Sequence, residues 1–417
     1  MIIEKSVLGG EITLPSSKSE LHRALICAAL CDKKSTINGF SECEDITATA
    51  NALKEMGADI ITEGATAWVC AGNIKNRDAA AVVDCKNSAS TLRFLMPVAA
   101  ALHKKTTFIL GESLASRPIT PYLDIFEKHG AKIETAKNKI TVSGGLCGGR
   151  YIVDTTVSSQ FLSGFLMALP LLDAPCKIVC SGDSVSAKYV DMTTEIMRRF
   201  GVNITNKSRA YKVFPAEYKE SVFTSCGDWS AAAFYYAAAA LGAKITLKGL
   251  DKDSFQPDRA ATEIFNDLGV NTAFLPNGDI SLSPAAKDHN IKIDLTHNPD
   301  LFPAVCVAAT GLKTTEITGV SRLSNKESNR LYAMQKGLLS FGVKTEISGD
   351  KFTVLGGKPN TGNRKIQGFG DHRIVMAFAI LSAFCEGKTE ITTAKSVQKS
   401  YPEFFNHFKS LGGKCFE

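Results

Sequence analysis

The stretch EMGADI, residues 55–60, ends a run with helical periodicity and opens a short apolar one. Similar stretches recur at residues 128–133 (KHGAKI), 199–204 (RFGVNI), 267–272 (DLGVNT), 340–345 (SFGVKT) and 410–415 (SLGGKC). By subtraction, their glycines are 73, 71, 68, 73 and 70 residues apart: Gly57, Gly130, Gly201, Gly269, Gly342 and Gly412. Glycine after a last helical turn is the usual left-handed cap, so each stretch predicts a helix end followed by a strand.

Each copy of this repeat also begins alike. A polar cluster precedes an Ala/Leu-rich helix, a strand such as TTFILG (106–111) or AKITLKG (243–249) follows, and a second helix leads to the glycine. Three copies make about 200 residues, an ordinary domain size. We therefore expect an α/β protein of two domains with three repeats each, joined near FTSCGDWS (223–230).

Composition favours a small anionic substrate. The 417 residues are 44% hydrophobic and 22% charged, with a net charge of +6. Basic residues form no long clusters, so we expect no nucleic-acid partner. The longest apolar runs, near residues 94–102 and 231–243, are too short to span a bilayer, so we expect no membrane partner.

The twelve cysteines are scattered and include no CxxC pair. Cys27/Cys31 and Cys176/Cys180 have i,i+4 spacing but no nearby ligand partners, so we expect no metal site. The opening residues MIIEKSVLGG carry an acidic residue and turn polar at once, unlike a secretory signal peptide. We therefore expect reduced thiols in a cytoplasmic protein.

The polar and charged residues that could bind or react with a substrate are concentrated in the six repeat openings. They read SSKSELHR (16–23), KNSASTLR (86–93), TVSSQFLS (156–163), CGDWSAAA (226–233), HNPDLFPA (297–304) and GFGDHRIV (368–375). Ser, Asn and Asp are good N-cap residues, and Ser17 with Glu20 fits a capping box. Capping does not require the added cations Lys18, Arg23 and Arg373. Because helix N-termini attract anions, the repetition favours an anion-binding cleft.

Nine stretches, in order and in matching repeats, resemble the 3-phosphoshikimate 1-carboxyvinyltransferase (5-enolpyruvylshikimate-3-phosphate synthase) family over nearly the full length. They are LPSSKSELHRAL, KNSASTLRF, SRPITPYLD, VSSQFL, SAKYVDMT, NPDLFPA, NKESNRLYAM, GDHRIVMA and KSYPEFF. The resemblance implies transfer of the enolpyruvyl group of phosphoenolpyruvate to the 5-hydroxyl of shikimate 3-phosphate, with release of phosphate. The reaction passes through a tetrahedral adduct, needs no cofactor, and lies on the shikimate pathway to chorismate and aromatic amino acids.

The resemblance also implies site residues. The residues implied for shikimate 3-phosphate are Lys18, Ser19, Arg23, Ser158, Ser159, Gln160, Ser186, Tyr189, Asp300 and Lys326. Those implied for phosphoenolpyruvate are Lys18, Asn87, Ala89, Arg117, Gln160, Arg330, His372, Arg373 and Lys399. Both substrates are polyanions, and the planar fork of arginine suits carboxylate and phosphate groups.

Three residues, of which Glu327 is in neither list, are implied to be catalytic. Asp300 would act as general base, Glu327 would handle the proton at C3, and Lys18 would stabilise charge on both substrates. The division of the proton steps among them stays open. Without the resemblance, Asp300 would be a cap or turn residue. Likewise Arg330, three residues after Glu327, would lie on one face of a solvated charged helix.

Two departures from the family pattern concern inhibition by glyphosate. Ala89 and Ser90 stand where Gly and Thr are common, and the methyl group of Ala89 would crowd a bulky analogue more than phosphoenolpyruvate. Arg322 replaces a frequent Asn. We therefore expect glyphosate to inhibit this enzyme weakly.

The implied fold has two similar domains, each of three βαβαββ units, with the site in the cleft between them and closing around substrates. We expect domains of residues 14–226 and of residues 1–13 with 227–417, in a monomer. One rival is UDP-N-acetylglucosamine enolpyruvyl transferase, which often carries a Cys in the loop that here reads LGESLASRP (110–118). The other rival, a non-catalytic anion-binding protein of this fold, predicts loss of the proton-transfer groups.

Overall fold

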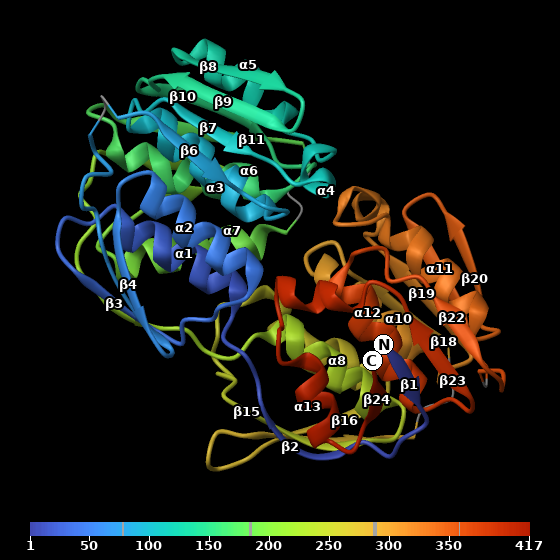
Figure 1. The fold of residues 1–417 in the computed structure, drawn as a ribbon. Helices are drawn as coiled ribbons and strands as arrows, with labels where there is room; N and C mark the ends of the chain where they lie inside the picture. Colours follow the sequence, from blue (N-terminus) through green and yellow to red (C-terminus); the bar gives the residue numbers. More distant parts are fainter. Residues whose placement is uncertain (77–78, 183–185, 287–289, 358) are drawn as a thin grey trace. The chain divides into compact units, whose positions relative to one another are not determined.

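The computed structural model describes residues 1–76, 79–182, 186–286, 290–357 and 359–417. The chain divides into two compact units, one of residues 16–225 and one of residues 1–15 with 226–417. Figure 1 colours the first from blue to green and the second mainly from yellow to red. They are termed the 16–225 unit and the terminal unit.

The 16–225 unit contains three successive repeats and a closing strand. The first repeat comprises α1 (Lys18–Ala29), β3 (Ser35–Asn38), α2 (Glu44–Glu55), β4 (Asp59–Glu63) and β5 (Thr66–Cys70). The second comprises β6 (Ala81–Asp84), α3 (Ala89–Ala101), β7 (Thr106–Ile109), α4 (Glu112–Ala115), α5 (Thr120–Lys128), β8 (Ala131–Ala136) and β9 (Lys139–Gly144). The third comprises β10 (Gly149–Asp154), α6 (Ser159–Ala168), η1 (Leu169–Leu171), β11 (Cys176–Ser181), α7 (Ala187–Arg199), β12 (Thr205–Lys207) and β13 (Ala210–Val213), before β14 (Val222–Thr224).

The terminal unit repeats the same order. It begins with β1 (Ile2–Glu4) and β2 (Gly9–Thr13), then α8 (Trp229–Ala240), β15 (Lys244–Lys248), η2 (Pro257–Ala260), α9 (Ala261–Asp267), β16 (Val270–Phe274) and β17 (Ile280–Pro284). Next come β18 (Asn290–Asp294), η3 (Pro299–Leu301), α10 (Phe302–Ala309), β19 (Thr314–Thr318), η4 (Ser321–Asn325), α11 (Arg330–Ser340), β20 (Lys344–Ser348) and β21 (Lys351–Leu355). The last repeat has β22 (Arg364–Ile366), α12 (His372–Ala383), β23 (Lys388–Ile391), η5 (Ala394–Lys399), α13 (Phe404–Ser410) and β24 (Lys414–Phe416).

Each repeat supplies at least three strands of one four-stranded sheet. In the second repeat the strand order is β6-β7-β9-β8, with β6 parallel to β7 and the β8–β9 hairpin antiparallel. The third and fifth repeats have the same order and directions. This is the βαβαββ unit that the family resemblance implies, and the prediction of an α/β fold built from six such repeats is confirmed.

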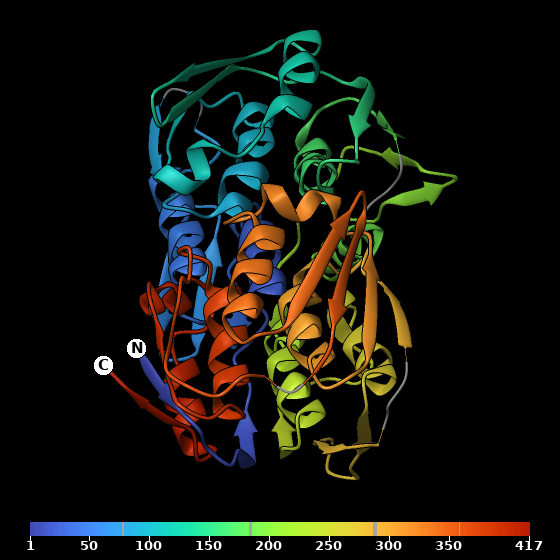
Figure 2. The same ribbon diagram turned by 90° about the vertical axis from the view of Figure 1, so that its right-hand side faces the viewer.

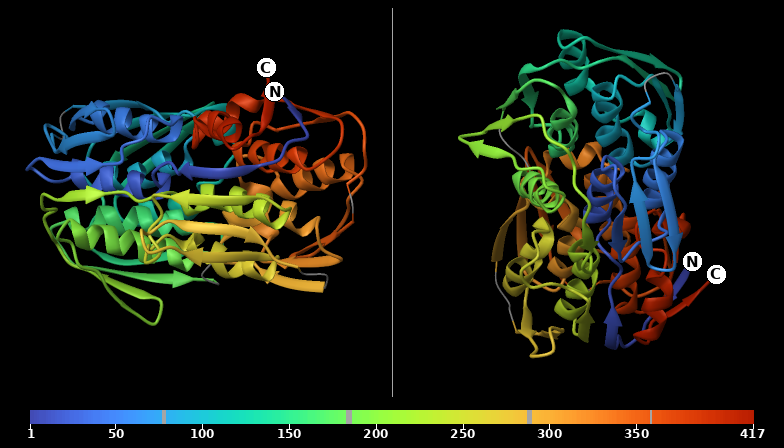
Figure 3. Two further views of the ribbon diagram at one scale, coloured as in Figure 1. Left: turned by 90° about the horizontal axis from the view of Figure 1, so that it is seen from below. Right: turned by 90° about the vertical axis from the view of Figure 1, so that its left-hand side faces the viewer.

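Two strands are exchanged between repeats. The strand β2 precedes α1 in the chain, yet it pairs in parallel with β15, with Ile12 opposite Leu247. Conversely, β14 precedes α8 but pairs in parallel with β3, with Phe223 opposite Ile37. The N-terminal strand β1 lies between β23 and β24 and so completes the last sheet (Figure 2, Figure 3).

The core of each unit is built around three helices that are buried on nearly every side. These are α1, α3 and α6 in the 16–225 unit, and α8, α10 and α12 in the terminal unit. A helix that is apolar all round belongs in an interior. The second helices of the repeats, such as α7, bury one face only. The six repeat openings therefore lie at the N-termini of the buried helices.

The glycine caps predicted from the repeat are confirmed. Gly57, Gly130, Gly201, Gly269, Gly342 and Gly412 all have positive φ, between +78° and +106°. At Gly57 a Cβ atom would also lie 2.9 Å from the backbone of Asn73. A side chain there would be strained by both the conformation and the contact.

Two further observations complete the fold. Within the described part of the chain, no helix is both long and apolar enough to cross a bilayer. The twelve cysteines are free thiols, and Cys147 is exposed.

Candidate active site

Serine side chains cap the three buried helices of the 16–225 unit. Ser17, Ser88 and Ser158 accept hydrogen bonds from the backbone N–H groups of Glu20 (3.4 Å), Thr91 (3.3 Å) and Gln160 (3.3 Å). The Ser17 half of the predicted capping box is thus present, whereas the carboxylate of Glu20 accepts from the hydroxyl of Ser225. Each cap satisfies one of the N–H groups that have no partner within the helix, at the positive end of the helix dipole.

Lys18 and Arg23 lie at the start of α1 and have different surroundings. The Nζ of Lys18 is 2.7 Å from the carboxylate of Asp45, and both side chains are largely buried. Arg23 is 3% exposed and donates to Thr193 Oγ1 (2.7 Å) and to the carbonyl oxygens of Ser19 (2.8 Å) and Tyr189 (3.4 Å). Burial lowers the pKa of Arg23 to about 10. Arg23 therefore brings the predicted residues Ser19 and Tyr189 together.

Gln160 is held in one orientation by two neighbours. Its Oε1 accepts from Arg93 (2.8 Å) and its amide donates to Ser90 Oγ (3.0 Å). Arg93, itself 3% exposed, also donates to the carbonyl of Pro118 (2.9 Å) beside Arg117. Neither Asp45 nor Arg93 was assigned a site role from the sequence, although Arg93 belongs to a repeat opening.

The remaining predicted residues of this unit lie at helix starts and turns. Ala89 is buried at the first position of α3, and Ser159 is buried at the first position of α6. Asn87 accepts from the N–H of Leu114 (3.3 Å) and lines a groove of about 1170 Å³ beside α2. Arg117 is half-buried between α4 and α5, and Ser186 precedes α7 with a φ of +55°.

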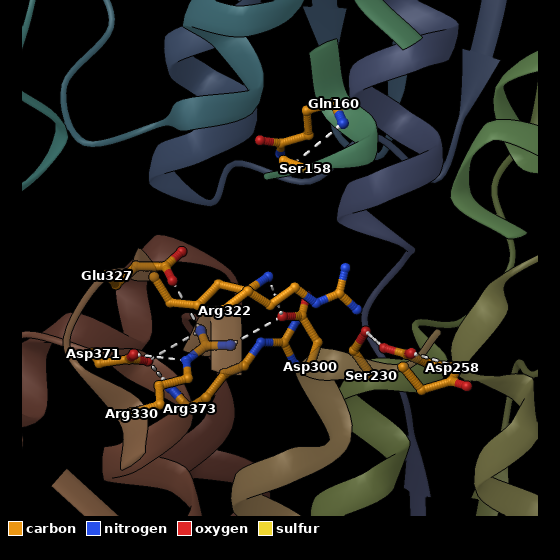
Figure 4. Close-up of polar contacts among 12 residues, drawn as sticks. Ser158, Gln160, Ser230, Asp258, Asp300, Arg322, Glu327, Arg330, Asp371 and Arg373 are labelled. Carbon is orange, nitrogen blue, oxygen red and sulfur yellow. Dashed lines mark hydrogen bonds and ion pairs between the residues drawn. The ribbon is translucent and has the colours of Figure 1, made fainter. Parts of the chain in front are cut away.

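In the terminal unit, Arg330 lies at the centre of a buried cluster of charges (Figure 4). It is 0% exposed, and its guanidinium donates to Asp300 (2.9 Å), Glu327 (2.9 Å) and Asp371 (2.9 Å). The interpretation of Arg330 and Glu327 as one face of a solvated helix is wrong. The helix α11 begins at Arg330 and is capped by Asn329, so Glu327 precedes it.

Asp300 contacts three cations. Besides Arg330, its carboxylate lies 3.0 Å from Arg373 Nη2 and 3.4 Å from Lys326 Nζ. Burial raises the pKa of Asp300, but Arg373, Lys326 and Arg330 together bring it well below its usual value. Burial lowers the pKa of Lys326 to about 8, against the opposing charge of Asp300. Asp300 is therefore ionised at neutral pH. The pKa of Lys326, about 8, lies close to neutral pH.

The start of α12 completes this cluster. Asp371 is 0% exposed, caps the helix by accepting from the N–H of Arg373 (2.9 Å), and accepts from Ser328 (3.1 Å). His372 is buried with Nδ1 3.9 Å from Asp371, and Lys399 is buried at the end of η5. Asp371 was missed as a site residue because GDHR also reads as an ordinary helix cap. Among the described residues, no group of His, Cys, Asp and Glu is arranged to hold a metal ion.

The predicted site residues thus form two groups, one in each unit. Eleven belong to the 16–225 unit: Lys18, Ser19, Arg23, Asn87, Ala89, Arg117, Ser158, Ser159, Gln160, Ser186 and Tyr189. Seven belong to the terminal unit: Asp300, Lys326, Glu327, Arg330, His372, Arg373 and Lys399.

A sequence model of the family EPSP synthase (3-phosphoshikimate 1-carboxyvinyltransferase) matches residues 3–408. The chain belongs to the EPSP synthase family. It is 39% identical to the 3-phosphoshikimate 1-carboxyvinyltransferase of Clostridium kluyveri, over 100% of this chain and 98% of that protein. It is 37% identical to a protein of the same name from Clostridium perfringens, over 99% of this chain and 98% of that protein.

The structure of the EPSP synthase of Acinetobacter baumannii aligns with 99% of this chain and 97% of its own, with a TM-score of 0.80 and 23% identity. That likeness concerns the fold. The resemblance to EPSP synthases drawn from the nine sequence stretches is confirmed by the family match and by the two Clostridium relatives.

Proposed function

We propose that this protein transfers the enolpyruvyl group of phosphoenolpyruvate to the 5-hydroxyl of shikimate 3-phosphate. The hydroxyl oxygen adds to C2 and gives up its proton to a base, while C3 gains a proton from an acid and becomes a methyl group. The tetrahedral adduct then loses one proton from C3 as its C2–O bond to phosphate breaks, leaving 5-enolpyruvylshikimate 3-phosphate and phosphate. The observation that carries the proposal is the buried Asp300–Arg330–Arg373–Lys326 cluster in a chain of the EPSP synthase family.

The residues proposed for shikimate 3-phosphate combine helix starts with fixed cations. In this proposal the phosphate binds the first turn of α6 at Ser158 and Ser159, where backbone N–H groups outside the cap bond and the serine hydroxyls serve as donors. Arg23 supports this site through Ser19 and Tyr189. On the terminal unit, Asp300 and Lys326 take the hydroxyl groups of the ring.

The residues proposed for phosphoenolpyruvate are mostly arginines. Arg330 and Arg373 take its carboxylate, with His372 and Lys399 nearby in the terminal unit. Lys18, Asn87, Ala89, Arg117 and Gln160 supply the other contacts from the 16–225 unit. Gln160 is suited to this role because Arg93 and Ser90 already fix its orientation. Pre-organised polar groups stabilise a transition state at little reorganisation cost.

The cluster suggests how Asp300 becomes a base only when substrate is bound. A carboxylate whose pKa is well below its usual value is a weak proton acceptor. A phosphoenolpyruvate carboxylate bound to Arg330 and Arg373 shares their positive charge, and this raises the pKa of Asp300. Glu327, bonded to Arg330, then handles the proton at C3, and Lys18 stabilises charge on both substrates.

We propose a monomer acting in the cytoplasm, where its twelve free thiols stay reduced. Analytical ultracentrifugation at assay concentration checks the first point, and a stable active dimer would contradict it.

The decisive experiment measures phosphate release. Purified protein with shikimate 3-phosphate and phosphoenolpyruvate should release one phosphate per enolpyruvyl group transferred, and omission of either substrate should abolish release. A parallel reaction replaces shikimate 3-phosphate with UDP-N-acetylglucosamine. Release only in that parallel reaction, or in neither, would overturn the proposal.

A further inference from the structure

Asp258 is a buried carboxyl group to which neither the proposed reaction nor the sequence comparison gives a role. It lies in η2 of the terminal unit and is 1% exposed. Its carboxylate accepts hydrogen bonds from the hydroxyl of Ser230 and from Asn298 Nδ2 (3.2 Å). Figure 4 shows Ser230 and Asp258 turned toward one another, beside Asp300.

These bonds join three segments that come from two successive repeats. Ser230 belongs to the first turn of α8, and Asn298 comes immediately before η3, two residues ahead of Asp300. Asn298 also donates to the carbonyl of Pro257 (2.7 Å), so η2 holds it at two points. At the starts of α8 and α12, the side chains of Asp228 and Asp371 cap the backbone. At the start of η3, by contrast, the side chain of Asn298 makes no cap bond. Its side chain is used to bind η2 instead.

A second residue of the same segment anchors α8. Gln256, just before η2, accepts from the N–H of Trp229 (3.0 Å) and donates to the carbonyl of Gly227 (2.9 Å). The start of α8 and the backbone carrying Asp300 are therefore both attached to residues 256–258. In contrast, the cations that contact Asp300 reach it through the ends of long side chains.

The charge of Asp258 also acts on the cluster. Burial raises the pKa of Asp258 to about 6, with Asp300 raising it and Arg373 lowering it. Burial lowers the pKa of Arg373, but Asp300, Asp258 and Asp228 more than offset this effect. An ionised Asp258 thus repels the carboxylate of Asp300 and attracts the guanidinium group of Arg373.

We propose that Asp258 is a positioning residue, which fixes the turn at Asn298 and so holds Asp300 in place against Arg330 and Arg373. The proposal rests on the proposed function, because Asp300 matters to turnover only if the chain performs the transfer. It assigns to the FQPD segment (255–258) a role in catalysis that requires no contact with substrate.

Two substitutions separate geometry from charge. In Asp258→Asn, the amide oxygen can accept from Asn298 and the amide nitrogen can donate to Ser230, so the bonds persist without the charge. Asp258→Ala removes both bonds and charge. A misplacement of about 1 Å can cost about 10²-fold in rate. We expect Asp258→Ala to lower kcat by about 10- to 100-fold with a smaller change in the KM for phosphoenolpyruvate, and Asp258→Asn to recover most of that loss.

The pH profile provides a readout that a purely structural role would leave unchanged. Asp258 ionises near pH 6, so the parent should show an inflection in kcat/KM near that pH, and both variants should lack it. Ser230→Ala, which removes one bond and keeps the ionisable carboxyl group, should lower kcat less and retain the inflection. Its matched control is Ser382→Ala, which removes a buried serine bond near the C-terminal end of α12 and should leave kcat unchanged.

All rates are taken per folded enzyme, judged by near-UV circular dichroism. Equal losses in the Asn and Ala variants, or a kcat for Asp258→Ala within twofold of the parent, would overturn the proposal. If Asp258→Ala does not fold, Ser230→Ala decides: a kcat equal to that of Ser382→Ala rejects the positioning role. If the parent protein releases no phosphate, the proposed function fails. Positioning is then judged by the ¹³C chemical shift of the Asp300 carboxyl at pH 7, which must differ between the parent and Ser230→Ala.

Discussion

Replacing Arg330 by Met should destabilise the terminal unit strongly. The side chain of Arg330 is 1% exposed and holds three carboxylates, of which Asp371 is 0% and Glu327 is 13% exposed. In the variant, Asp300 keeps its ion pairs with Arg373 and Lys326. Asp371 and Glu327 therefore lose the largest share of their favourable electrostatic interactions. Removing one partner of a buried ion pair costs about 3–5 kcal/mol, because the other charge remains buried.

The expected change in melting temperature follows from the size of the unit. Residues 1–15 and 226–417 make 15 + 192 = 207 residues. For this size, 1 kcal/mol corresponds to about 2–4 °C, so the terminal unit should melt about 6–20 °C lower at pH 7. Differential scanning calorimetry measures the shift. Arg198→Met is the matched control, because Arg198 pairs with Glu195 in α7 but its side chain is 61% exposed; it should leave the melting temperature almost unchanged.

The destabilisation should also depend on pH. Burial raises the pKa of Asp371, but Arg330 and the other favourable contacts bring it below its usual value. A carboxyl group with a lowered folded-state pKa contributes stability above its unfolded pKa and loses it as the pH falls. The gap between parent and Arg330→Met should therefore be full at pH 7 and shrink below about pH 4. A melting temperature within 2 °C of the Arg198→Met control, or a gap independent of pH, would refute this reasoning.

Three further predictions concern activity. Lys18→Met should lower kcat by about 10²–10⁴-fold, whereas Lys33→Met, at a side chain 74% exposed, should not; equal rates for the two would remove Lys18 from catalysis. Asp300→Ala should cause a loss of about 10²–10⁴-fold in kcat, and retained turnover would exclude it as the base. Ala89→Gly should make the enzyme more sensitive to glyphosate in competition with phosphoenolpyruvate, and identical inhibition constants would show that the buried methyl group is irrelevant.

Local signals in the sequence predicted much of the fold. The six glycines were identifiable because a left-handed cap has one strongly preferred residue, and all six adopt positive φ. The polar openings marked the starts of the buried helices, because Ser17, Ser88, Asp228 and Asp371 cap backbone groups only a few residues away. These features depend on neighbours within one turn of the chain.

The site residues were assigned from the family resemblance, and only some of them also stood out by their position in the sequence. Lys18, Arg23 and Arg373 stood out in repeat openings because capping gives no reason for a cation. Arg330 did not: its spacing from Glu327 fits an exposed helix equally well. Its three carboxylate partners come from residues 300, 327 and 371, and no local pattern links such distant positions.

The sequence by itself therefore determined the repeat, its helix ends and the kind of residue at each opening. Only the tertiary structure decided which strand completes which sheet, since β2 and β14 each pair outside the repeat that follows them in the chain. It also decided that Arg330 is buried and that Asp258 joins Ser230 to Asn298. Caps and turns involve near neighbours and so leave a local pattern. Strand exchange and buried charge clusters depend on long-range packing, in which a charge becomes tolerable only once its distant partners are in place.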